Sequence, residues 1–102
     1  METENGLGKY TISEKAFREI AAIACTNIKD IYPYKKDKDF VDCTFDKEGN
    51  LTVNLSLRVK KGIDLVKLCS KVQSEVGENI LLMTGKDCAQ VNIDIKGFET
   101  DK

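Results

Sequence analysis

The sequence feature that most constrains the fold is a strict alternation of apolar and polar side chains over residues 51–60. Every odd position holds Leu or Val, and every even position holds a polar or charged side chain. Successive side chains of a β-strand point to opposite faces of its sheet, so this run predicts a long strand with one buried face. A helix could not bury such a pattern, because its side chains repeat every 3.6 residues. The chain therefore contains a sheet that buries one face and leaves the other polar.

Shorter segments extend this sheet. Residues 41–45 alternate in the same way, and the turn-forming residues 46–50 connect them to the long strand, which predicts a β-hairpin. Residues 89–96 alternate again, and we expect Gly97 to end that strand. A short extended segment is expected over residues 9–12.

Two segments repeat their apolar residues with the period of a helix. The first covers residues 14–28 and is preceded by Ser13, a good N-cap. The second follows the N-cap candidate Asp64 and runs to Met83, with Gly85 placed to end it. The order is thus a short β-α-β-β-α-β. It predicts an α+β two-layer sandwich with a mixed or antiparallel sheet, two helices on one face and the other face open.

A single domain accounts for the chain, because its 102 residues lie near the commonest domain size of ~100–150. We expect a flexible N-terminal tail over residues 1–8, the domain over 9–98 and a C-terminal tail over 99–102. Pro33 and dense charge predict a loop over 29–39. No apolar run reaches the ~20 residues of a membrane span, and no signal peptide is visible, which favours a cytoplasmic location.

The composition removes most catalytic and metal chemistry. The chain has no histidine, which excludes Ser-His-Asp and Cys-His catalytic arrangements and histidine-bound zinc. The cysteines form no C-x-x-C pair and fall in or beside apolar patterns, so we expect buried, reduced thiols. Asp42 and Asp94 share the polar face, where we expect them to be solvated. We therefore expect no enzyme, catalytic residue, cofactor or metal; a thiol-dependent enzyme or redox sensor is the remaining catalytic alternative.

The polar face of the sheet is the first candidate for function. It mixes Thr, Asn, Ser and Gln with single charges, whereas 32% of the whole chain is charged. Such a face can dock a partner or a second copy, and plain solvent exposure is an equal alternative. It displays no aromatic residue for stacking bases, unlike many RNA-binding sheets. The candidate interaction face comprises Thr44, Thr52, Asn54, Ser56, Arg58, Gln90, Asn92 and Asp94.

The loop over residues 29–39 is the second candidate, because aromatic and cationic side chains are both frequent at interfaces. The candidate contact loop comprises Tyr32, Tyr34, Lys35, Lys36 and Lys38. A solvated loop with one packed tyrosine is the alternative. Together with Lys60 and Lys61, its lysines suggest an alternative function as a small nucleic-acid-binding module. The net charge of −1 gives no overall attraction to nucleic acid.

A series of short segments carries a further signal. In order they are Gly8–Ser13, Ile20-Ala21-Ala22, Gly62–Leu65, Val72-Gln73 with Val76, Met83-Thr84-Gly85 and Val91–Gly97. Together they resemble the alkaline shock protein, or envelope stress response, family of Gram-positive bacteria, over about residues 8–98. The resemblance implies a cytoplasmic, non-enzymatic protein of cell-envelope homeostasis. It also implies self-association as a homo-oligomer, or docking to a membrane-anchored protein that recruits the chain to the inner face of the membrane, with no small-molecule substrate.

Overall fold

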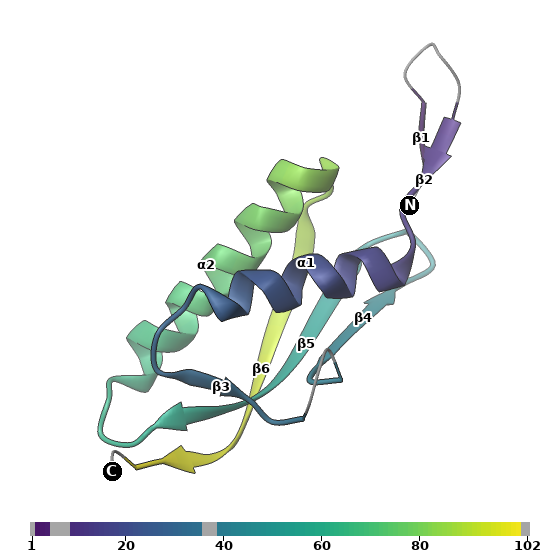
Figure 1. Cartoon of the computed structure of the whole chain (residues 1–102). Helices are drawn as coiled ribbons and strands as arrows, with labels where there is room; N and C mark the ends of the chain where they lie inside the picture. Colours follow the sequence, from purple (N-terminus) through teal and green to yellow (C-terminus); the bar gives the residue numbers. More distant parts are fainter. Residues whose placement is uncertain (1, 5–8, 36–38, 101–102) are drawn as a thin grey trace.

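The computed structural model describes residues 2–4, 9–35 and 39–100 (Figure 1). Its elements in chain order are β1 (Glu2–Glu4), β2 (Lys9–Thr11), α1 (Glu14–Thr26), β3 (Ile31–Pro33), β4 (Val41–Phe45), β5 (Leu51–Lys60), α2 (Leu65–Thr84) and β6 (Cys88–Glu99). Strands β3, β4, β5 and β6 form one sheet, and both helices cover the same face of it (Figure 1). The predicted α+β sandwich with an open sheet face is confirmed.

Strand β5 pairs with every other strand of the main sheet. β6 runs parallel to it along one edge, over Leu51–Lys60. On the opposite edge, β4 pairs antiparallel with Leu51–Leu55 and β3 pairs antiparallel with Leu57–Val59. The two short strands therefore occupy one edge of β5 in succession. Because parallel neighbours need a long crossover, α2 connects β5 to β6 across the covered face.

The alternation in β5 divides core from surface as predicted. Its odd-numbered side chains are at most 1% exposed, whereas its even-numbered ones are half-buried. Phe17 and Ala21 of α1 are fully buried above this strand, and α2 adds Val76 and Ile80. Each large apolar side chain buried in this way stabilises the fold by roughly 1.5–3 kcal/mol. The small alanines of α1 let that helix approach the sheet closely.

Both predicted helix starts and the end of the second helix are confirmed. The Ser13 hydroxyl oxygen accepts a hydrogen bond from the Ala16 amide at 3.2 Å, and the Asp64 carboxylate accepts one from the Lys67 amide at 3.2 Å. Gly85 ends α2 with a φ of 75°, a left-handed conformation that glycine adopts without strain. Helix α1 ends at Thr26, before the predicted residue 28.

The prediction of a loop over residues 29–39 is wrong for Ile31–Pro33, which form β3. Asp30, with a φ of 71°, turns the chain back along β5, and Ile31 is buried beside Val59. Pro33 is tolerated because β3 is an edge strand, where a missing amide hydrogen costs little.

The prediction that Gly97 ends the last strand is also wrong. Strand β6 continues to Glu99, and the pairing with β5 shifts register between Leu57 and Arg58. Gly97 pairs with Arg58 directly after the shift, so this glycine marks an irregularity within the strand.

The N-terminal residues contain a strand where the sequence predicts a tail. β1 and β2 pair antiparallel in a separate two-stranded sheet, which projects from the body beyond the start of α1 (Figure 1). The other tail residues, 1, 5–8 and 101–102, lie outside the described residues. The expected domain limits therefore stay a prediction.

The β4–β5 turn provides a test of stability against pH. Asp46 accepts hydrogen bonds from the amides of Glu48 and Asn50, both at 2.9 Å, and from the Asn50 side chain at 3.0 Å. The bonds from Asn50 lower the pKa of Asp46. The carboxylate therefore stabilises the fold above its unfolded-state pKa of ~3.9, and this contribution is lost as pH falls through the lower folded-state pKa.

Asp46→Asn should reduce the urea midpoint at about pH 7, because it removes the charge but keeps the shape of the side chain. The deficit should disappear in acid, where the wild-type carboxyl is also neutral. Lys47→Ala in the same turn is the matched control and should show no such pH dependence. A deficit that persists unchanged in acid would contradict this role of the Asp46 charge.

Candidate interaction surface

The sheet register places the whole candidate interaction face on one surface. The rows that cross the strands are Thr44–Thr52–Gln90, Asp42–Asn54–Asn92 and Ser56–Asp94, followed by Arg58. Residues contributed by β4 and β6 are exposed, whereas those of β5 are half-buried because strands flank them on both sides. The open face therefore presents hydroxyl and amide groups along three adjacent strands.

An asparagine pair lies in the middle of this face. Asn92 donates a hydrogen bond from Nδ2 to Oδ1 of Asn54 at 3.1 Å, between the parallel strands β5 and β6. An asparagine side chain has two donor hydrogens and an oxygen with two lone pairs, so this bond uses only part of its capacity. The pair thus offers directional, uncharged groups to a partner.

Strand β3 and the residue directly after it, Tyr34, add two tyrosines to the open face, so the expectation of a face without aromatic residues is wrong. Tyr32 pairs in register with Arg58, and the Tyr34 amide donates a hydrogen bond to the Ser56 carbonyl at 3.0 Å. Tyr32 is 40% exposed and Tyr34 is 48% exposed. The two candidate surfaces of the sequence, the face and the loop, therefore meet along β3.

Lys96 links the two surfaces, although it is not one of the residues of the candidate interaction face. Its ammonium group lies 2.8 Å from a carboxylate oxygen of Asp94 and 5.7 Å from the ring centroid of Tyr34. The hydrogen bond to Asp94 raises the pKa of Lys96. Ser56 pairs with Asp94 on the strand between Lys96 and Tyr34, and its short side chain leaves room for the lysine to cross β5.

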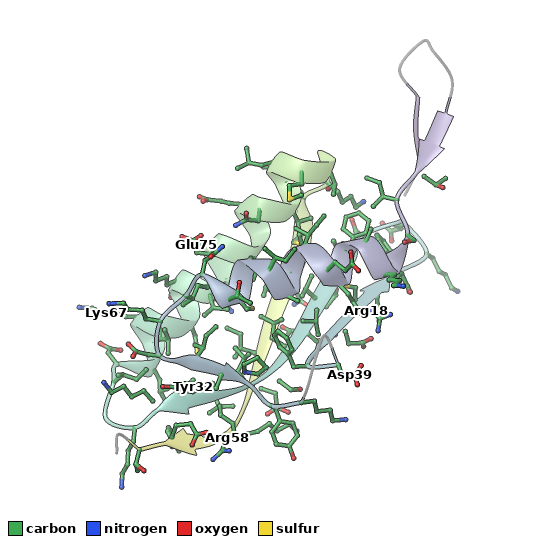
Figure 2. The ribbon with its side chains drawn as sticks, viewed as in Figure 1. Arg18, Tyr32, Asp39, Arg58, Lys67 and Glu75 are labelled. Carbon is green, nitrogen blue, oxygen red and sulfur yellow. The ribbon has the colours of Figure 1, made fainter. Side chains whose placement is uncertain are left out.

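Arg58 lies at the far end of the same face. Its guanidinium is 3.2 Å from Glu99 and donates a hydrogen bond to the Phe98 carbonyl at 3.4 Å. A Cβ atom at Gly97 would lie 3.5 Å from Arg58 Nε, so the arginine packs along a bare stretch of backbone. Figure 2 shows Tyr32 and Arg58 at the same end of the sheet. Exposed ion pairs stabilise a fold by only ~0–1 kcal/mol, so these charges can re-pair with a partner at low cost.

We call these residues together the extended open face: the candidate interaction face with Tyr32, Tyr34 and Lys96. Of the remaining members of the contact loop, Lys35 is exposed. Lys36 and Lys38 lie outside the described residues, so their part in the surface stays a prediction.

The described side chains give little support for thiol or metal chemistry. Cys25 and Cys43 are buried, and burial raises the pKa of each thiol to about 11. Burial also raises the pKa of Cys88. Such thiols stay protonated near neutral pH and are poor nucleophiles. Within residues 2–4, 9–35 and 39–100, no group of three Cys, Asp or Glu side chains is arranged to hold a metal ion.

Comparison with protein-family models assigns residues 2–100 to the alkaline shock protein 23 family, which has a cell envelope-related function. The chain belongs to the alkaline shock protein 23 family. This match covers nearly the whole chain and confirms the family predicted from the sequence. Comparisons with curated proteins and with solved structures find no match. Among the described residues of this family member, neither helix has the length and apolar character needed to cross a bilayer.

Thiol alkylation tests the structural role of the cysteines in this alkaline shock protein family member. In native protein at about pH 8, iodoacetamide should modify the half-buried Cys69 first, while Cys25 and Cys43 should react only as fast as the protein unfolds. Peptide mass mapping over time measures each site. In urea, all four cysteines should react at similar rates, which is the control. Rapid labelling of native Cys25 would contradict this and favour the redox-sensor alternative.

Proposed function

We propose that this chain is a non-enzymatic interaction protein of the cell-envelope stress response. It acts by self-association, or by docking to a membrane-anchored partner, through the extended open face. Family membership supports the envelope-related role. The observation that carries the proposal is the joining of Tyr32 and Tyr34 with the amide and hydroxyl groups of the open face on one uncovered surface.

The composition of this surface suits protein recognition. Tyrosine and arginine are enriched at protein interfaces and among the residues that contribute most to binding. Tyr34 and Arg58 lie on the extended open face beside neutral amides, and the nearby charges of Asp94 and Glu99 are already paired within the sheet. A partner can therefore cover the part of the face around Asp94 and Glu99 without leaving an unpaired charge buried, which would be costly.

The proposed location follows from the same model of action. The protein is cytoplasmic, and its partner holds it at the inner face of the membrane. Recruitment then depends on the extended open face and on the amount of partner present, so the protein can move between the cytoplasm and the membrane surface.

Two lysines at the asparagine pair should weaken the interaction. In the double variant Asn54→Lys with Asn92→Lys, neighbouring positive charges replace the hydrogen bond, so we expect association to fall by about tenfold or more. Light scattering over a concentration series measures self-association. Co-purification from the native host under envelope stress, with and without the variant, measures docking to the partner.

The matched control places two lysines on the exposed surface of α2, at Ser70 and Ser74. Ser70→Lys with Ser74→Lys adds the same charge and should leave both measurements unchanged. If the asparagine variant keeps the wild-type mass and the wild-type partner, the extended open face is not the surface that binds.

A small nucleic-acid-binding module is the second candidate, favoured by one observation. Tyr34 lies under the Lys96 ammonium, and the exposed Tyr32 pairs with Arg58. Exposed aromatics beside cations are the groups on which single-stranded nucleic acids stack. Asp94 and Glu99 already form ion pairs with Lys96 and Arg58. These pairs weigh against nucleic-acid binding.

A salt titration separates the two candidates. The protein-interaction proposal predicts no retention of fluorescein-labelled oligo(dT) or oligo(U), even at low ionic strength. Nucleic-acid binding instead predicts retention that weakens steeply with salt and that Tyr34→Ala reduces. Fluorescence anisotropy gives the result, and Tyr10→Ala in the N-terminal hairpin is the control substitution.

A further inference from the structure

A groove on the helix-covered side of the sheet takes no part in the extended open face. Its volume is about 480 Å³, within the ~300–1,000 Å³ typical of binding pockets. It runs along α1 and faces the ends of β3 and β4. The lining residues are Lys15, Arg18, Ala22, Ile23, Thr26, Pro33, Asp39 and Phe40.

The groove follows from the way β3 and β4 share one edge of β5. The Tyr34 amide and the Phe40 carbonyl both hydrogen-bond to Ser56, so β3 gives way to β4 at this residue of β5, and α1 passes above this point (Figure 1). Ala22 is 6% exposed and Phe40 is 3% exposed, and both give the groove an apolar floor. Because Ala22 has a small side chain, the space beside it stays open.

The rim of the groove combines an exposed apolar residue with cations. Ile23 is 59% exposed, so most of this large aliphatic side chain is open to a partner. Arg18 lies one turn before Ala22 on the same stripe of α1, and Lys15 lies about two turns before it. Neither forms an ion pair with another described residue. Figure 2 shows Arg18 directed from α1 toward the segment that carries Asp39, which is the acidic residue among those lining the groove.

We propose that this groove binds a segment of a partner protein that presents a large apolar side chain and a carboxylate about one helical turn apart. The apolar side chain packs on Ala22 and Phe40 under the edge of Ile23, and the carboxylate binds Arg18. The rise of ~1.5 Å per residue separates Arg18 from Ala22 and Ile23 by roughly 6–7.5 Å, close to one turn of a docked helix.

Charge complementarity selects an acidic segment. Among the described residues that line the groove are two cations, Lys15 and Arg18, and one carboxylate, Asp39, and an arginine binds a carboxylate through two parallel hydrogen bonds. Helices that dock in grooves use anchors spaced by one turn, which matches the arrangement along α1.

This inference goes beyond the proposed function, because the groove and the extended open face lie on opposite sides of the sheet. Either surface can therefore fail its test without affecting the other.

The probe is a phage-displayed library of random peptides of about 12 residues, selected on the full chain. Peptides that also bind Ile23→Glu are removed. Enriched peptides should carry Asp or Glu three or four positions from Leu, Ile, Met or Phe. A fluorescein-labelled synthetic copy of the most enriched peptide is then titrated by anisotropy.

Ile23→Glu and Arg18→Gln should each lower the affinity for that peptide by about tenfold or more. Raising NaCl from about 50 mM to about 500 mM should also lower the affinity for the peptide, because the ion pair between Arg18 and the peptide carboxylate contributes to binding. Ile23 is exposed and Glu is a good helix former, so this variant keeps the fold.

Matched controls come from α2. Val66 is 78% exposed, so Val66→Glu repeats the Ile23 change outside the groove, and Lys71→Gln repeats the loss of an exposed cation. Both should bind the peptide as the wild type does. The Asn54→Lys, Asn92→Lys variant should also keep peptide binding, which separates this test from that of the proposed function.

Several outcomes would overturn the proposal. Selection could give no peptide that depends on Ile23, or it could enrich peptides without a carboxylate. Arg18→Gln could bind as tightly as the wild type. If Ile23→Glu instead lowers the self-associated mass in light scattering, the occupant of the groove is a second copy of the chain, and a partner segment is the wrong assignment.

Discussion

The fold depends on the hydrogen bonding of β5 along both of its edges. Every other strand of the main sheet forms its hydrogen bonds with this one, and its odd-numbered side chains form the buried centre of the molecule. A slip of one residue in its register would move Leu55 to the open face and Asn54 into the core. Burial of the apolar side chains therefore fixes the register, and the register sets which polar groups lie together on the other face.

The elements that the sequence predicts well are those whose signals are local. Alternation identifies β5, and single capping residues such as Ser13 and Asp64 locate the helix starts. Strand β3 could not be predicted in this way, because it is short, contains Pro33 and buries only Ile31. Its existence depends on pairing with Val59, which is distant in the sequence.

The candidate surface shows the same division. Its polar positions were predictable because residues of equal parity share a face of a strand. The addition of Tyr32 and Tyr34 depends on the left-handed turn at Asp30, and the crossing of Lys96 over Ser56 depends on the order of three strands. The groove beside α1 likewise arises where β3 gives way to β4. These features are tertiary, and no short segment of the sequence contains them.

The parallel pairing of β6 also has a consequence during synthesis. The strand follows α2 in the chain, so it leaves the ribosome after the rest of the main sheet. Until then one edge of β5 is unpaired along its whole length, and the partly buried Ile93 and Ile95 are not yet in place to cover the core. An unpaired strand edge beside exposed apolar residues promotes aggregation. The nascent chain is thus most exposed to misassembly just before its last strand emerges.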